Sequence, residues 1–418
     1  MVKKSRISTV NMVVLALSIS GCSVDLSRID DRLEPIASPL LSGGETGAAL
    51  PKTNQPEPYA SIVLKNFEEV EFRLDDNLKT LENSRLRARQ SQLPQVTPGA
   101  SVGSSGIAGI DLGFRQVLLN GDLSKAIFHD ADVQAVNRQI TLLQAVNTDV
   151  LEDIQIYLSY HENIEREALL SDLTLLLEDL ISLAKTRLEG GIGTADEVTL
   201  FKLELTEVQT DALIARSNAK VDLSSLNDVD ASLSPTSFRQ QSAHLPIEVL
   251  AAIADRDEAR SNLTVVKEAA EPRLVLEATA RIGVTTISPV SNAGLSVEAD
   301  PIRFGGNPDI LEAEQAAFLA ERELEETISE VERDTLRLLQ QISALESQEK
   351  QTTLLVDQTQ ARLEGFRERF LSGNAGLSEA AGLIDTLRRA LEQKVDVQYG
   401  ILNLQSELTA KLGHFWEF

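Results

Sequence analysis

The chain has 418 residues, 42% of them hydrophobic, and a formal net charge of −25 at pH 7. So acidic a surface argues against a nucleic-acid-binding protein, which needs a basic face to hold phosphates. The four histidines are scattered without metal-ligand spacing, and no nucleophile or phosphate-loop motif occurs. We therefore expect neither an enzyme nor a protein that holds a cofactor or a metal.

Residues 1–21 have the layout of a secretory signal peptide. A basic start precedes an apolar run that is too short for a permanent membrane helix. The run ends in "ISGC", which resembles the lipobox of bacterial lipoproteins and contains the only cysteine, Cys22. This resemblance implies cleavage before Cys22 and its acylation, and Ser23 after it favours sorting to the outer membrane. The alternative is an ordinary signal peptide followed by a chance cysteine.

Residues 22–56 are rich in proline, serine and glycine, which predicts an extended, lipidated tether. Cleavage of the leader would remove three basic groups and no acid, leaving a mature net charge of about −28. Beyond the leader, no apolar run approaches the roughly 18 residues of a membrane helix. If the mature protein crosses a membrane, it must do so with strands.

The remaining chain divides into two similar halves, 57–227 and 246–418, joined by a linker at 228–245. Internal similarity of this kind is typical of proteins built from structural repeats. Each half opens with a helical stretch, 57–92 in the first and 246–272 in the second, that ends at a proline. We expect the two halves to have the same order of elements.

Two alternating stretches follow the proline in each half. Residues 273–284 alternate apolar and polar side chains, which is the period of a β-strand, whereas 96–102 is a weaker version that contains Pro98. The second stretches are 110–114 and 295–299. Their length and alternation fit membrane-barrel strands, with a soluble hairpin packed on a helix as the alternative. Four strands cannot close a barrel, so membrane strands here would require an oligomer.

Long segments without glycine or proline follow the strands, at 122–189 and 309–364. In the first, apolar residues recur at spacings of three and four, which indicates a helix with a packing seam. A helix of about 60 residues runs about 90 Å at 1.5 Å per residue. The outgoing segments 195–227 and 377–412 are also predicted helical. Each half therefore ends in a long helical hairpin.

The tips of these hairpins read "RLEGGIGTADEV" (187–198) and "RFLSGNAGLSEA" (369–380). Each places a glycine four residues after an arginine, Gly191 and Gly373, and a glutamate six residues later. We expect both glycines to adopt the left-handed backbone that lets a helix reverse. Ile192 is an apolar residue at the exposed end of its hairpin, which favours cover by a partner.

The two-fold recurrence of these elements resembles the TolC-type outer-membrane efflux and secretion channels, in particular their lipidated branch. The resemblance is carried by both tip segments and by "DPIRFGG" after the fourth strand, and it spans nearly all of the mature chain. It implies a mainly α protomer with long coiled-coil helical hairpins and four strands. It further implies a homotrimer with a twelve-strand β-barrel and a helical tunnel.

The resemblance also implies a function, partners and site residues. Family members are passive ducts that dock onto a periplasmic adaptor and an inner-membrane pump, either proton-driven or of the ABC type, in efflux or type I secretion. It implies adaptor docking at Gly191, Ile192 and Gly373. It also implies an acidic ring in the lumen, formed by Glu379 and by Glu197, the equivalent residue of the first repeat. Both glutamates could instead be helix N-terminal carboxylates stabilised by the helix dipole.

We therefore expect a lipid-anchored outer-membrane protein with a large periplasmic portion. A second hypothesis is a periplasmic coiled-coil scaffolding lipoprotein without a pore.

Overall fold

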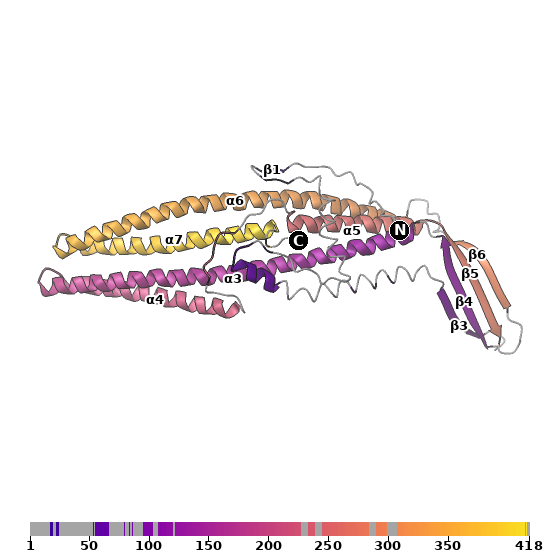
Figure 1. The fold of residues 1–418 in the computed structure, drawn as a ribbon, viewed down its shortest axis with the longest axis horizontal. Coiled ribbons are helices and arrows are strands. Elements are labelled where there is room, and N and C mark those ends of the chain that lie inside the picture. Colours follow the sequence, from indigo (N-terminus) through magenta and orange to yellow (C-terminus); the bar gives the residue numbers. More distant parts are fainter. Residues whose placement is uncertain are drawn as a thin grey trace.

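The computed structural model describes residues 17–19, 22–24, 53, 55–66, 79, 83, 86, 95–102, 108–119, 122–226, 233–238, 245–283, 290–298, 307–413 and 415. Figure 1 shows an elongated molecule with helical hairpins at one end and a small sheet at the other. A separate pair of strands, β1 (Leu17–Ile19) and β2 (Cys22–Val24), is antiparallel.

Both predicted helical hairpins are present. The first consists of α3 (Leu123–Glu189, 67 residues) and α4 (Ala195–Ser225), and the second of α6 (Pro308–Leu371, 64 residues) and α7 (Leu377–Lys411). At 1.5 Å per residue α3 is about 100 Å long. None of the helices in the described ranges has a stretch long and apolar enough to cross a membrane.

The sequence explains where these helices begin and how they pack. The side chain of Asn307 caps α6 by accepting a hydrogen bond from the Asp309 N–H, and Pro308 occupies the first helical position. The predicted seam of α3 runs from Val133 to Leu158. Its residues are buried from Ile140 onward, but Val133 and Val136 are only half-buried. These are the seam residues nearest the sheet.

The helices pack in the order α4, α3, α7, α6. α3 lies between α4 and α7, and α7 lies between α3 and α6. α5 (Ile247–Ala270) packs between α3 and α6 closer to the sheet, in line with α7 (Figure 1). α4 and α6 are therefore the two outer helices of the protomer.

The sheet contains β3 (Gln95–Val102), β4 (Ala108–Leu119), β5 (Arg273–Gly283) and β6 (Val290–Glu298), all antiparallel and in that order. The central β4–β5 pair joins the two repeats. Pro98 lies in the edge strand β3, where a missing N–H is tolerated. β4 begins at Ala108 and β6 at Val290, so both strands begin earlier than the predicted stretches 110–114 and 295–299.

The β4–β5 pair has a charged contact on the face that the alternation predicts to be polar. Arg115 on β4 lies directly opposite Glu277 on β5, and the two form an ion pair at 3.7 Å. Asp111 and Arg281 are cross-strand partners in the same register. The opposite charges of Arg115 and Glu277 favour this register over its neighbours.

The ends of the repeats meet half-way along the molecule. The Tyr59 hydroxyl donates to the carbonyl of Thr236 at 2.9 Å, and the Phe238 ring stacks on Tyr59 at 4.2 Å. Thr53 donates to the Phe415 carbonyl at 2.8 Å, and Gln55 is buried. The packed structure thus begins before residue 57, where the tether was expected to end.

The helix predicted over 57–92 is observed at 59–66 and at positions 79, 83 and 86. Residues 57 and 58 form a turn before it, and the other positions of that prediction lie outside the described residues.

Candidate functional site: the hairpin tips

Both hairpins reverse through a glycine with positive φ. Gly191 has φ 71° and Gly373 has φ 76°, which confirms the predicted left-handed backbone. In the first tip the Ile192 N–H donates to the Arg187 carbonyl at 3.0 Å, and in the second the Asn374 N–H donates to the Arg369 carbonyl at 2.8 Å. The repeated sequence therefore produces the same turn twice.

The two tips of one protomer touch each other. A Cβ placed on Gly373 would lie 3.2 Å from Cγ2 of Ile192, so the isoleucine covers the glycine of the other hairpin. Ile192 nevertheless remains 62% exposed. Gly191, Ile192 and Gly373 are thus brought together at one end of the molecule, the end opposite the sheet (Figure 1).

A buried arginine fastens the first tip to the second. Arg187 is 6% exposed and forms an ion pair with Glu197, with Nη2 at 3.3 Å from Oε1. Its guanidinium lies 4.0 Å from the centroid of the Phe370 ring, and Nη1 donates to the Phe370 carbonyl. One side chain therefore closes its own turn and holds the end of α6.

Glu197, which the resemblance assigns to an acidic ring in the lumen, is buried within the protomer. Its side chain is enclosed with Arg187, so it presents no free charge at the surface of the protomer. The tip backbone passes directly over this pair. A Cβ on Gly193 would lie 2.9 Å from both the Arg187 Cβ and the Glu197 Oε2. Only glycine fits there, whereas the second tip has Ala375 at the equivalent position.

The second tip carries the same ion pair in an open setting. Arg369 pairs with Glu379, and a second contact joins Nη1 to Oε2 at 3.4 Å. Both side chains are partly exposed. Glu379, unlike Glu197, therefore keeps an accessible carboxylate. Both glutamates lie in the first turn of their helices, where the helix dipole stabilises a negative charge.

Sequence reasoning did not assign roles to Arg187, Arg369 or Phe370. The identical ten-residue spacing from arginine to glutamate in both tips was the available signal for the ion pairs. The Phe370 contact had no such signal, because it joins residues 183 positions apart in the chain.

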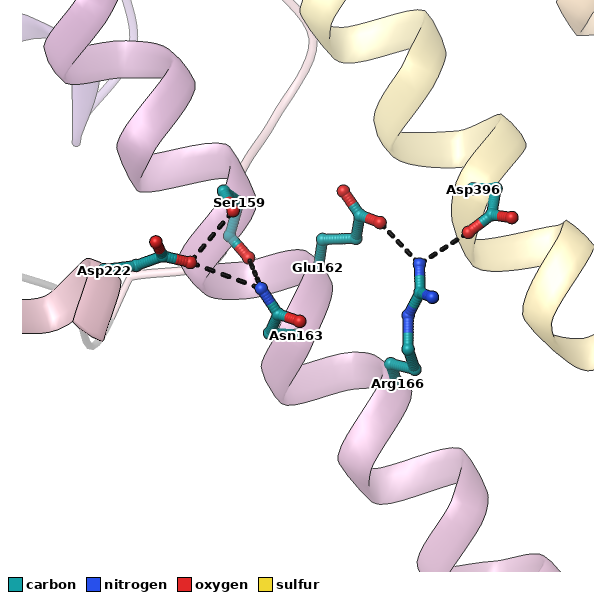
Figure 2. Close-up of polar contacts among 6 residues, drawn as sticks. All are labelled: Ser159, Glu162, Asn163, Arg166, Asp222 and Asp396. Atoms are coloured by element: carbon teal, nitrogen blue, oxygen red, sulfur yellow. Dashed lines mark hydrogen bonds and ion pairs between the residues drawn. The ribbon is translucent and has the colours of Figure 1, made fainter. Parts of the chain in front are cut away.

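A second polar cluster lies where α3, α4 and α7 meet. Figure 2 shows Arg166 of α3 between Glu162 of the same helix and Asp396 of α7, each at 2.6 Å. Asp222 of α4 accepts hydrogen bonds from Ser159 at 2.9 Å and from Asn163 at 3.2 Å (Figure 2). The cluster ties the first hairpin to the second at mid-height.

Burial shifts the pKa of carboxylates in and near this cluster. It raises the pKa of Glu162; the Arg166 charge opposes this effect and Asp396 adds to it. Burial likewise raises the pKa of Glu392 on α7 and of Glu204 on α4. No group of three or more metal-binding side chains occurs among the residues that the structure describes.

Cys22 lies in β2, but its side chain is outside the described part, so its predicted acylation remains a prediction.

Comparison with solved structures identifies the architecture. The chain superposes on the outer membrane protein VceC from Vibrio cholerae with a TM-score of 0.69 at 14% identity, covering 93% of this chain and 97% of that one. The outer-membrane channel OprN gives a TM-score of 0.70 at 13% identity, over 89% and 96% of the chains. The chain has the fold of the TolC-type outer-membrane channels.

The CmeC outer membrane channel of Campylobacter jejuni matches over 99% of this chain and 95% of its own, with a TM-score of 0.65 at 13% identity. The TolC-type fold therefore accounts for both repeats and not for one hairpin alone. Neither a protein-family model nor a curated protein sequence matches the chain.

Proposed function

We propose that this protein is the outer-membrane channel of an efflux or secretion system, a passive homotrimeric duct that receives its cargo from a periplasmic adaptor and an inner-membrane pump. The observation that carries the proposal is the two-repeat architecture, with its sheet at one end and paired tips at the other. The solved structures that share this architecture are outer-membrane proteins and channels.

The protomer supports assembly with further copies. β3 and β6 have one unpaired edge each within the described part of the sheet. The outer helices α4 and α6 expose large apolar side chains, including Leu203, which is 65% exposed, and Phe318, which is 63% exposed. Three copies would join four strands each into a closed set of twelve and extend it with their helical hairpins into a tunnel.

The paired tips are the proposed docking surface for the adaptor. Ile192 is exposed beside Gly191 and Gly373, and glycine lets another backbone approach closely. Acylation of Cys22 would add a lipid anchor, with several acyl chains giving firm attachment.

Substitution of a tip glycine tests this function. A Cβ on Gly191 would meet nothing within 4 Å among the described residues, so Gly191→Arg strains only the positive φ, at a cost of about 1 kcal/mol. We expect Gly191→Arg to form normal trimer in the outer membrane but to abolish dye efflux and adaptor cross-linking in cells that depend on this channel.

The control is Ser182→Arg, which adds the same charge at an exposed position on α3, away from the turn. It should leave efflux unchanged. Normal efflux by Gly191→Arg would show that the tips do not dock an adaptor, and loss of its trimer would show that the turn is only structural.

A further inference from the structure

The second hairpin has an opening that the first hairpin lacks. Subtracting the 182-residue repeat offset, which is 373 − 191, places Gly365 of α6 at Leu183 and Gly382 of α7 at Leu200. A Cβ on either glycine would meet nothing within 4 Å among the described residues. Leu183 and Leu200 are half-buried in their hairpin. The first hairpin thus fills with its own leucines a space that the second leaves open.

This opening is a groove on the flank of the second hairpin, close to its tip. Its lining also includes Arg362, Arg369 and Leu383. Glycine within a helix lowers its stability relative to alanine, and no described residue of the protomer fills the space beside Gly365 or Gly382. We call the part of the groove at Gly365 and Gly382 the glycine notch.

The notch continues a row of exposed apolar residues on α6. Phe318, Leu336 and Leu354 are exposed and follow one another at intervals of 18 residues, which is five helical turns. Gly365 is 11 residues further, about three turns. Leu363 is nine residues after Leu354, or about two and a half turns, and it is buried. The row therefore lies on the face of α6 opposite its intramolecular packing.

The other outer helix carries a matching row. Leu203, Ile214 and Val221 of α4 are exposed, at spacings of 11 and 7 residues. Both spacings are close to whole numbers of turns, so the three share one face. The 11-residue interval from Leu203 to Ile214 equals the interval from Leu354 to Gly365.

We propose that α4 of a second copy of this chain packs antiparallel on α6, with its Leu203 seated in the glycine notch and its Ile214 against Leu354. The proposal rests on the homotrimer proposed above and assigns the side chains of its seam. It also explains why the opening occurs in only one hairpin, since only the second hairpin contributes α6 to the seam.

The distances of these residues from the hairpin tips, measured along the helices, agree with the pairing. The tips of one protomer are level, because Ile192 covers Gly373. Leu203 lies eight residues from the start of α4, about 12 Å, and Gly365 lies six residues from the end of α6, about 9 Å. Helical side chains lean toward the N-terminus, and the N-terminus of α4 is at the tip. Leu203 of the second copy therefore leans toward the notch.

The groove has charged side chains at its rim, where Arg369 pairs with Glu379. Asp196 of α4 lies two turns before Leu203 on the same face and is exposed. In this register Asp196 of the second copy comes to the level of Arg369, at the rim of the groove.

Cysteine cross-linking tests the pairing directly. Cys22 is the only native cysteine, so oxidation of the unchanged full-length protein gives the background. We expect Leu203→Cys with Gly365→Cys to form a covalent ladder of dimer and trimer on oxidation, since a disulfide requires Cα atoms within about 7 Å. The matched control is Leu213→Cys with Gly365→Cys. Leu213 is exposed too but lies ten residues further along α4, about 15 Å.

The oligomeric state, measured by mass on the detergent-extracted protein, separates the outcomes. A trimer with the covalent ladder only for the 203–365 pair supports the proposal. A trimer without that ladder overturns the proposed seam but leaves the homotrimer intact. The notch would then be available to a different protein, such as an adaptor. A monomer contradicts the proposed function, and with it this seam.

A substitution that fills the glycine notch provides the second test. Gly365→Leu places its side chain in space that is open within the protomer, so the fold should tolerate it. We expect the trimer to dissociate at a lower temperature in Gly365→Leu. Adding Leu203→Ala should restore the original dissociation temperature in the double variant. An unchanged dissociation temperature in Gly365→Leu would overturn the seam.

Discussion

At the residue scale, the two tips use one sequence pattern for two different purposes. Arg187 and Glu197 are enclosed and hold the end of α6, whereas Arg369 and Glu379 are partly exposed. Removing one partner of a buried ion pair leaves an uncompensated charge, whereas exposed pairs contribute little. The same change in the two tips should therefore have very different costs.

We expect Arg187→Ala to destabilise the first tip by about 3–5 kcal/mol, because Glu197 is left buried and unpaired. Hydrogen exchange of the amides at 186–198 would measure it, as faster exchange in the variant. The matched change Arg369→Ala should cost about 0–1 kcal/mol. Equal effects of the two substitutions would show that Arg187 does not fasten the tips.

At the element scale, the junction of α3, α4 and α7 contains carboxylates whose charged form is disfavoured by burial. The pKa of Glu162 is raised above its ordinary value, mainly by burial. The stability that its protonation contributes is therefore present below the ordinary glutamate pKa and is lost as pH rises through the raised value. At neutral pH the charged Glu162 weakens the junction.

We expect Glu162→Gln to melt at a higher temperature than the unchanged protein at pH 7.5, with the difference shrinking toward pH 4. Glutamine keeps an acceptor for Arg166 without the charge. Thermal melts across this range would measure it, with the exposed Glu346→Gln as control. A difference that grows on acidification would contradict the role of burial at Glu162.

At the element scale, part of the fold could be predicted from the sequence. The long helices and both reversing glycines follow from local periodicity and backbone preference. The burial of Glu197 and the contact of Arg187 with Phe370 did not, because both depend on how the two hairpins pack together. Ion pairs within a turn are encoded by spacing, whereas contacts between repeats are encoded only by the fold.

At the scale of the whole molecule, the protomer is one third of the proposed duct. Its sheet edges and its outer helices α4 and α6 are the surfaces that further copies would cover. The exposed apolar residues recur in rows along both outer helices, as expected for surfaces that an assembly buries.

An assembled duct would place three copies of Glu379 near its periplasmic end, where they favour cations. We expect Glu379→Gln to lower the cation-to-anion permeability ratio, measured as a shift in reversal potential across a salt gradient. Glu197→Gln should leave that ratio unchanged, because Glu197 is buried with Arg187. An unaltered ratio in Glu379→Gln would support the helix-dipole role instead.

The central claim is that three copies of this chain form an open path through a membrane. Single-channel recording of the purified full-length protein in a planar lipid bilayer tests it most directly. We predict stepwise conductance from the trimeric fraction and none from the monomeric fraction. A stable trimer that inserts without conductance would contradict the claim and favour a coiled-coil scaffold.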